Sequence, residues 1–457
     1  MTTVLVEGFD ADALALGRFL AGEGHDVRLA GAGDAPAEAT TLLGCGIRVE
    51  SRADLDEDPG AADVAYLDVW TPETAPRVQR LRAQGTRVSC LGDLLLERWQ
   101  GPTVGITGTA GKTSTTSLVA EILRTAGIEI AMSSGARSGN LWPTADLLDR
   151  LERRDSATRP LLLLELTSSH LAFMRSSPTI AAVISFWPDH LELHGDLAHY
   201  RAAKETIVRH QSAADTVVVN ADDASAGFAS ITPAGLVEFS LRRKVEHGAY
   251  LDPSRGVVLV DSSGETTVGP IHAQTAHPGN AAAAAAIAAA AGAGPAAITR
   301  GIGTAAALPW RAQRQGTLAG IPVVDDGMAA TPLKALALLT AYSDQSIVLI
   351  AGGLDDAGGG PVHATPEEHV QLERACDEIA RTACSVIVFG EGGARLAALL
   401  EQRTVDQQTV ADLAEAVAVA AARAARSPDV TEVVFSPLFP LAPEQRALFA
   451  VLVAQNP

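Results

Sequence analysis

A short run of glycine, lysine and threonine, "GITGTAGKTST" from Gly105 to Thr115, carries residue types that can bind phosphate. It lies between an apolar stretch typical of a strand and a stretch typical of a helix. In that position the backbone N–H groups of the turn point at a phosphate, and the helix dipole adds to the field. The Lys112 ammonium can reach the terminal phosphates and the Thr113 hydroxyl can bind Mg²⁺. We therefore predict an ATP site that comprises Gly108, Thr109, Gly111, Lys112, Thr113 and Ser114.

This loop departs from the strict phosphate-loop pattern at one position. The pattern G-x-x-x-x-G-K has glycine where this chain has Ile106, and the neighbouring glycines are Gly105 and Gly108. The alternative is a loop that matches this pattern by chance and binds no phosphate. The strand, loop and helix context favours the nucleotide site.

Candidate metal ligands follow farther along the chain. Four leucines precede Glu165, as in a buried strand that delivers a carboxylate beside Mg²⁺, although buried strands commonly end in an acid. The segment "PDHLELHGDLAHYRAAKE" then holds Asp189, His190, His194 and Lys204. Histidine and carboxylate at this density suit a metal, and a solvated helix face is the alternative.

Apolar β-rich runs alternate with helical stretches, which predicts an α/β protein with helices covering largely parallel sheets. Residues 2–8 and 25–31 read as strands around a helix over 10–24, the first unit of a Rossmann-like domain. The phosphate loop begins a second series of strands, and a third series begins near Leu308. We expect three domains: an N-terminal Rossmann-like domain (1–100), a central P-loop ATPase-type domain with a parallel or mixed sheet (101–307), and a C-terminal Rossmann-like domain (308–457).

Charge and composition exclude several classes of partner. The 457 residues carry a net charge of −19, which disfavours a nucleic-acid or anionic-membrane partner, although solubility alone also explains such acidity. The four cysteines form no closely spaced pair, and the Ala-rich run 280–294 is shorter than the roughly 20 residues that span a bilayer. We expect a cytoplasmic monomer that acts on small molecules.

Several motifs occur together in order: "GITGTAGKTST", the Glu of "LELTSS", "DHLELHGDLAHYRAAK", "NADD", "HPGN" and "LPWR". As a set they resemble the Mur ligase family, which makes peptidoglycan peptides and includes the folylpolyglutamate synthases. The resemblance covers nearly the whole chain, and it implies that the N-terminal domain binds the acyl substrate and the C-terminal domain binds the amine. The short first domain, "ELTSSHL", "GNLWP" and "SPLFP" are most similar to the branch of UDP-N-acetylmuramoylalanine–D-glutamate ligases.

The resemblance implies an ATP- and Mg²⁺-dependent ligase that converts a carboxylate into an acyl phosphate, which an amine then attacks. It implies that Lys112 contacts the β- and γ-phosphates, and that Thr113 and Glu165 hold a first Mg²⁺. His190 and Lys204 would hold a second Mg²⁺, with Lys204 carbamylated. The remaining implied contacts are Asn280 with adenine, Arg311 and Asp326 with the nucleotide when the third domain closes, and Asn140 with the acyl substrate.

The chain departs from that branch where the amine would bind. The matching stretch there carries a Lys and a Thr, at the positions of Met328 and Ala330. A further Lys that pairs with the incoming carboxylate is replaced by Asp356, and a hydroxyl residue of the C-terminal loop by Leu441. A carboxylate held about 4 Å from another is repelled by about 4 kcal/mol at an effective dielectric constant of 20. We therefore expect a neutral or cationic amine rather than D-glutamate.

The N-terminal domain departs as well, because Asp10 and Asp12 stand where the family has a glycine-rich turn beside the diphosphate. Acids at a helix N-terminus cap the helix, and they also disfavour a bound pyrophosphate. The leading prediction is an amide ligase with different substrates, recruited to specialised metabolism. One alternative is a peptidoglycan-precursor ligase that adds glutamate or another amino acid to UDP-MurNAc-L-alanine. The other is a non-catalytic nucleotide-binding homologue.

Overall fold

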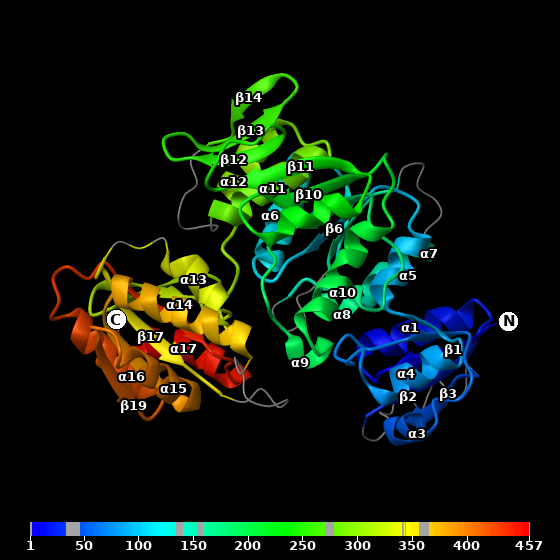
Figure 1. The fold of residues 1–457 in the computed structure, drawn as a ribbon, viewed down its shortest axis with the longest axis horizontal. Helices are drawn as coiled ribbons and strands as arrows, with labels where there is room; N and C mark the ends of the chain where they lie inside the picture. Colours follow the sequence, from blue (N-terminus) through cyan, green and yellow to red (C-terminus); the bar gives the residue numbers. More distant parts are fainter. Residues whose placement is uncertain are drawn as a thin grey trace. The chain divides into compact units, whose positions relative to one another are not determined.

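The fold is α/β, with three sheets and helices on their faces (Figure 1). It was obtained as a computed structural model. The structure describes residues 2–32, 46–133, 140–152, 159–269, 278–340, 342, 344–355 and 365–456. These residues form two compact units, the first within Met1–Pro270 and Pro278–Thr304, and the second within Ala305–Pro457. The first unit holds two of the sheets. We retain the predicted division near residue 100 as a proposal.

The first sheet is parallel, in the order β3-β2-β1-β4-β5. The side chains of Val4, Leu5 and Val6 in its central strand are at most 2% exposed, which explains the continuous apolar run. The chain places β2 and β3 on one side of β1 and β4 and β5 on the other, so the strand order reverses between β1 and β4. Its elements are β1 (Thr3–Glu7), α1 (Ala11–Gly22), β2 (Asp26–Gly31), β3 (Arg48–Ser51), α3 (Arg52–Glu57), β4 (Val64–Tyr66), α4 (Pro76–Ala83), β5 (Arg87–Ser89) and α5 (Leu91–Arg98).

The second sheet is mixed, in the order β14-β13-β12-β11-β10-β9-β6-β8-β7. Its strands are β6 (Thr103–Thr107), β7 (Ile130–Ala131), β8 (Leu161–Glu165), β9 (Ile180–Val183), β10 (Thr216–Asn220), β11 (Gly235–Ser240), β12 (Gly248–Asp252), β13 (Gly256–Asp261) and β14 (Gly264–Thr267). Its helices are α6 (Lys112–Thr125), η2 (Ala145–Leu147), α7 (Leu148–Glu152), α8 (Ser168–Leu171), α9 (Leu191–His194), α10 (Leu197–Arg209), η3 (Ala224–Ile231), α11 (Pro278–Ala290) and α12 (Pro295–Thr304).

The last three strands of this sheet are antiparallel, which the alternating pattern did not predict. Gly256 and Gly264 begin β13 and β14 with φ values of 84° and 119°. Glycine adopts these angles without strain, so each can follow a tight turn. The antiparallel ribbon therefore depends on the turn residues rather than on hydrophobic alternation.

The third sheet lies in the second unit, in the order β15-β16-β20-β17-β18-β19. Strands β16, β20, β17, β18 and β19 are parallel, and β15 pairs antiparallel with β16. Buried side chains cover both of its faces. Its elements are β15 (Gln313–Leu318), β16 (Ile321–Asp325), α13 (Pro332–Leu339), β17 (Ile347–Gly352), α14 (Pro366–Thr382), β18 (Ala383–Phe389), α15 (Gly390–Leu400), β19 (Asp406–Val410), α16 (Leu413–Ala424), β20 (Glu432–Leu438) and α17 (Pro443–Gln455).

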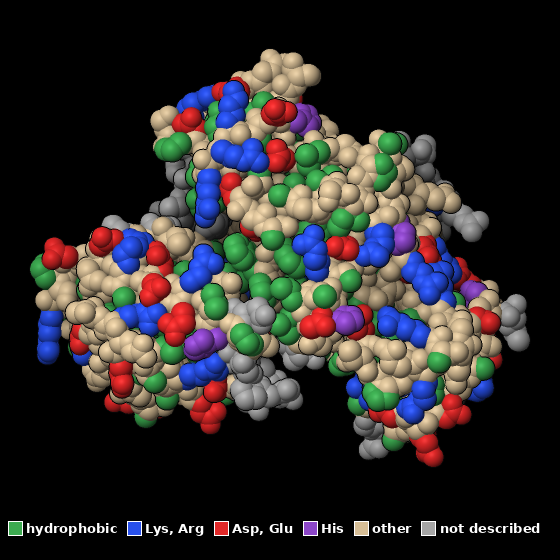
Figure 2. Space-filling model, viewed as in Figure 1, with side chains coloured by type: hydrophobic (Ala, Val, Ile, Leu, Met, Phe, Trp, Pro, Cys, Tyr) green, Lys and Arg blue, Asp and Glu red, His purple; other side chains and the backbone are tan. Residues whose placement is uncertain are grey.

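The surface carries charges of both signs. Lys and Arg side chains are interspersed with Asp and Glu on the face in Figure 2 rather than gathered into one basic field. The Ala-rich run that the sequence places near residue 280 is the buried helix α11. Within the described part of the chain, no helix is long and apolar enough to cross a bilayer.

Candidate functional site

The predicted phosphate loop joins β6, which lies between β9 and β8, to the N-terminus of α6. Gly111 caps this helix with φ at 81°, a left-handed conformation that favours glycine. A Cβ atom on Gly111 would lie 2.4 Å from Oδ1 of Asn280. The loop therefore has no room for a side chain there, and Asn280 of α11 packs directly against it.

Two lysines converge on this loop. The Lys112 ammonium donates to the Gly108 carbonyl at 2.8 Å, and the Lys204 ammonium donates to the same carbonyl at 3.1 Å. Lys204 also donates to the Thr107 hydroxyl at 3.2 Å, although its side chain is only 1% exposed. Two cations beside a glycine-rich turn favour an anion with several charged oxygens, as a nucleotide phosphate chain has.

Thr113, Glu165 and Asn140 form a second cluster at the start of α6. The Thr113 hydroxyl lies 3.0 Å from Oε1 of Glu165 and 3.1 Å from Oδ1 of Asn140. The other carboxylate oxygen of Glu165 accepts the backbone N–H of Leu141 at 2.9 Å, and Glu165 is fully buried. A hydroxyl and a carboxylate are the hard oxygen donors that Mg²⁺ prefers, so this pair fits the predicted first metal.

The residues predicted for a second metal are arranged differently. His190 has φ at 54°, and its imidazole is 43% exposed and lies 3.7 Å from the Asp189 carboxylate. Among the described side chains, no three of His, Cys, Asp and Glu gather into a metal site. His194 instead contacts Glu73 at 3.0 Å and is 2% exposed, which indicates a structural role. The second Mg²⁺ and the carbamate on Lys204 stay predictions.

Asp326 follows β16 in the second unit, where burial raises its pKa to about 7. Its carboxylate accepts the backbone N–H of Ala312 at 3.1 Å and the Ser436 hydroxyl at 3.2 Å. The Arg311 guanidinium and these hydrogen bonds lower the pKa only in part. Burial also raises the pKa of Asp325, to about 6. Asp326 and Arg311 are thus near enough to interact. The predicted contact of both residues with the nucleotide requires this proximity.

The residues predicted for the amine lie at the carboxyl ends of neighbouring strands of the third sheet. The Leu438 N–H donates to the Ala329 carbonyl at 3.0 Å, so the loops after β16 and β20 meet. Met328 and Leu441 therefore come close together, while Ala330 lies on the same loop as Met328. Asp356 lies outside the described residues.

Arg446 of α17 joins Met328 to Leu441. Its guanidinium lies 3.3 Å from the Met328 sulfur and 3.4 Å from the Leu441 carbonyl oxygen. Arg446 is half-buried and, among the residues that the structure describes, forms no ion pair with a carboxylate. The sequence motifs did not identify this residue. Its one signal in the sequence is its place, one turn into the helix that follows the "SPLFP" motif.

Comparison with known proteins agrees with this arrangement. The family described as Mur ligase middle domain matches residues 106–293. A UDP-N-acetylmuramoylalanine–D-glutamate ligase of Symbiobacterium thermophilum is 31% identical over 365 residues, which cover 77% of each chain. The ligase of the same name from Frankia casuarinae is 32% identical over 367 residues, covering 77% of this chain and 74% of that protein.

Solved structures of the family share the fold. MurF from Acinetobacter baumannii aligns with a TM-score of 0.62 at 16% identity, over 93% of this chain and 90% of that chain. MurF from Thermotoga maritima in complex with ADP aligns with a TM-score of 0.61 at 15% identity, over 94% and 96% of the two chains. The chain therefore belongs to the Mur ligase family, whose members are ATP-dependent ligases that form amide bonds.

Proposed function

We propose that this protein joins a carboxylate to the amino group of an amino acid with an uncharged side chain. The γ-phosphoryl group of ATP passes to a carboxylate oxygen, which yields an acyl phosphate and ADP. The amine nitrogen then attacks the carbonyl carbon, the bond from that carbon to the phosphate oxygen breaks, and the nitrogen loses a proton. The products are an amide and inorganic phosphate.

The first unit supplies the groups for activation. Lys112 offsets the negative charge of the phosphates, and the glycine turn admits the phosphates close to the backbone. Thr113 and Glu165 would hold Mg²⁺, which when bound neutralises phosphate charge. Asn140, 3.1 Å from the Thr113 hydroxyl, can orient the acyl carboxylate beside the transferred group.

The observation that carries the choice of amine is the position of Arg446. It places one guanidinium beside Met328 and Leu441, the positions that the sequence assigns to the amine. A guanidinium binds a carboxylate through two parallel hydrogen bonds. With uncharged residues at 328, 330 and 441, the pocket holds one carboxylate, and the α-carboxylate of a neutral amino acid suffices. D-glutamate carries a second carboxylate, and none of these three positions supplies a cation to pair with it.

A second candidate is a peptidoglycan-precursor ligase. Relatives that are 31% and 32% identical bear the name UDP-N-acetylmuramoylalanine–D-glutamate ligase, and this supports it. The replaced amine-site residues favour the first candidate, a ligase recruited to specialised metabolism. The two candidates differ in both substrates.

A substrate panel separates them. The full-length protein is incubated with ATP, Mg²⁺, a set of carboxylic acids, and amines with no, one or two carboxylates. ADP release is followed and products are identified by mass spectrometry, with Lys112→Ala as the inactive control. We expect amides with neutral amino acids. Efficient turnover of UDP-MurNAc-L-alanine with D-glutamate would establish the second candidate. Failure of every pair, with the Lys112→Ala variant unchanged in all properties, would contradict both.

A further inference from the structure

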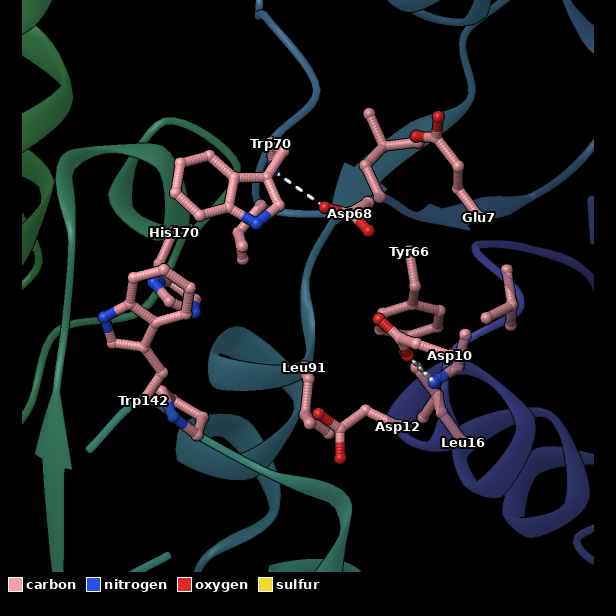
Figure 3. A pocket seen from close by; sticks show the side chains of 15 residues that line it. Glu7, Asp10, Asp12, Leu16, Tyr66, Asp68, Trp70, Leu91, Trp142 and His170 are labelled. Carbon is pink, nitrogen blue, oxygen red and sulfur yellow. Dashed lines mark hydrogen bonds between the residues drawn. The ribbon is translucent and has the colours of Figure 1, made fainter. Parts of the chain in front are cut away.

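A cavity of about 100 Å³ lies in the first unit, at the carboxyl ends of β1 and β4 (Figure 3). The strand order of the first sheet reverses between these two strands. In open α/β sheets, ligands bind in the crevice at such a reversal, outside the carboxyl ends of the strands. Loop residues that follow the phosphate-loop helix, among them Trp142, complete the wall. The cavity is therefore placed to hold a remote part of the substrate whose carboxylate is activated in this unit.

The wall is acidic. Four of the fifteen lining residues are carboxylic acids, Glu7, Asp10, Asp12 and Asp68, and none of the fifteen is Lys or Arg. Glu7 pairs with Arg77 at 2.8 Å and with Arg52 at 3.2 Å, whereas Asp68 forms no ion pair with any described residue. The Asp68 carboxylate therefore contributes a negative charge to the wall, which attracts a cation and disfavours a diphosphate.

The acids at the N-terminus of α1 have structural tasks as well. Asp10 accepts the backbone N–H of Ala13 at 2.9 Å and so caps the helix. Asp12 accepts the backbone N–H of Ala145 at 2.8 Å and ties α1 to the loop that carries Trp142. Both residues line the cavity at the end of β1, and their effect on a pyrophosphate stays a prediction.

Asp68 and two tryptophans form the part of the wall whose chemistry indicates the kind of ligand. One Asp68 oxygen accepts the Trp70 backbone N–H at 2.8 Å, and no ion pair to Asp68 occurs within the described part of the chain. Trp70 is 58% exposed and meets the Trp142 ring edge to face, with centroids 5.3 Å apart (Figure 3). Trp142 is 8% exposed, and its buried indole N–H has no hydrogen-bond partner among the described residues. An exposed tryptophan beside an unneutralised carboxylate is the combination that binds organic cations.

We propose that this cavity binds a cationic group, a protonated or quaternary amine, on the substrate that supplies the carboxylate. Asp68 supplies the charge and Trp70 the aromatic face. The role of this group as part of the acyl substrate rests on the proposed ligase function. Binding of a cation in the cavity can be measured without ligation. A cation site separates the protein from relatives whose name includes a UDP-linked substrate, since a nucleoside diphosphate would face the Asp68 carboxylate.

Calorimetric titration of the full-length protein tests the proposal, with choline as the cation, UDP as the diphosphate and N-acetylglucosamine as an uncharged sugar. We expect choline to bind to the wild type. In the Asp68→Asn and Trp70→Ala variants, its affinity should fall roughly tenfold, a typical value for one such contact. The asparagine side chain in Asp68→Asn can still accept the Trp70 N–H, so this substitution removes charge alone. Glu57→Gln removes one exposed charge from the helix α3 of the same unit, and it should leave choline affinity unchanged.

Other outcomes overturn the proposal. UDP binding to the wild type at comparable affinity would show that the cavity tolerates a diphosphate. Sugar binding without choline binding would assign a neutral ligand, and equal loss in Glu57→Gln would reduce the effect to net charge. An ATP titration of each variant confirms that the phosphate loop is folded. Choline binding without ligase activity would support the cation site and contradict the proposed function. Ligase activity without choline binding would do the reverse, so the two failures are distinguishable.

Discussion

At the scale of single residues, the predicted phosphate loop brings together charged side chains from distant parts of the sequence. Lys112 and Lys204 lie far apart in the sequence and yet donate to one carbonyl, that of Gly108. Glu165 is fully buried but keeps both oxygens occupied by Thr113 and Leu141. These hydrogen bonds offset part of the free-energy cost of burying a carboxylate.

Replacing Glu165 by Gln should abolish most ligase activity with little change in fold. Glutamine can still accept the Leu141 N–H, but it lacks the charge that Mg²⁺ requires. We expect kcat to fall about a hundredfold or more, the typical effect of losing one electrostatic contact in an active site. ADP release measures this. Glu129→Gln, at an exposed position just before β7, should retain full activity; an equal loss there would contradict the assignment.

Arg446 should determine the affinity for the amine. In Arg446→Met, the methylene stem is kept and the guanidinium is lost, so the carboxylate of the amino acid has no partner. A hydrogen bond to a charged group contributes about 1.5–3 kcal/mol, so KM for the amine should rise roughly tenfold or more while KM for ATP stays constant.

Steady-state kinetics with each substrate varied in turn check the Arg446 prediction. Arg426→Gln is the matched control, because Arg426 is an exposed arginine of the same unit. An unchanged KM for the amine in Arg446→Met would remove this residue from the amine site. Restored affinity in Arg446→Lys, even if partial, would show that the charge matters.

At the scale of elements, α12 and α6 illustrate how a small residue lets two helices pack closely. A Cβ atom on Gly301 of α12 would lie 2.6 Å from the Cα atom of Ile122 in α6, whereas one on Gly303 would meet nothing within 4 Å. The two glycines lie in the same helix and differ only in what they face.

Gly301→Ala should therefore destabilise the protein by about 1–3 kcal/mol, because the backbone of α6 cannot move aside without disturbing the core. Gly303→Ala should stabilise it by about 0.5–1 kcal/mol, because alanine loses less backbone entropy in a helix. Urea unfolding of both variants tests this. Equal effects of the two substitutions would mean that α12 does not pack closely on α6.

At the scale of the whole molecule, the second compact unit should lose stability as pH rises. Asp325 and Asp326, with pKa values raised to about 6 and about 7, both belong to the second unit. In the folded state each holds a proton that the unfolded chain, with an ordinary value of 3.8, has already released. The unfolded state then binds fewer protons, so the stability of this unit falls as pH rises from about 4 to about 7.

Asp326→Asn should remove most of this penalty. Asparagine keeps the hydrogen bond from Ala312, so the variant should be more stable than the wild type at about pH 8 and equally stable near pH 4. Hydrogen exchange of peptides from residues 305–456, recorded across this pH range, follows the second unit by itself. Asp429→Asn, at an exposed site, is the control. Equal stabilisation at all pH values would show that titration is not the cause.

The sequence by itself determined the α/β class, the phosphate loop and the family. These features are local: four leucines before Glu165 specify a buried strand, and Gly-Lys-Thr after β6 specifies a helix N-terminus that follows a glycine-rich turn. Each can be predicted from neighbouring letters, because backbone conformation and burial follow from short patterns. The antiparallel ribbon β12–β14 was missed, since its turns depend on glycines at left-handed angles rather than on alternation.

Only the tertiary structure decided which distant residues share a site. Strand order brings the loops after β16 and β20 together, and α17 then places Arg446 beside Met328, which reverses the apparent loss of charge there. In the same way, the position of α10 brings Lys204 to Gly108, and the reversal between β1 and β4 collects Asp10, Asp12 and Asp68 around one cavity. Local patterns cannot show such contacts, because they arise from the packing of elements far apart in the chain.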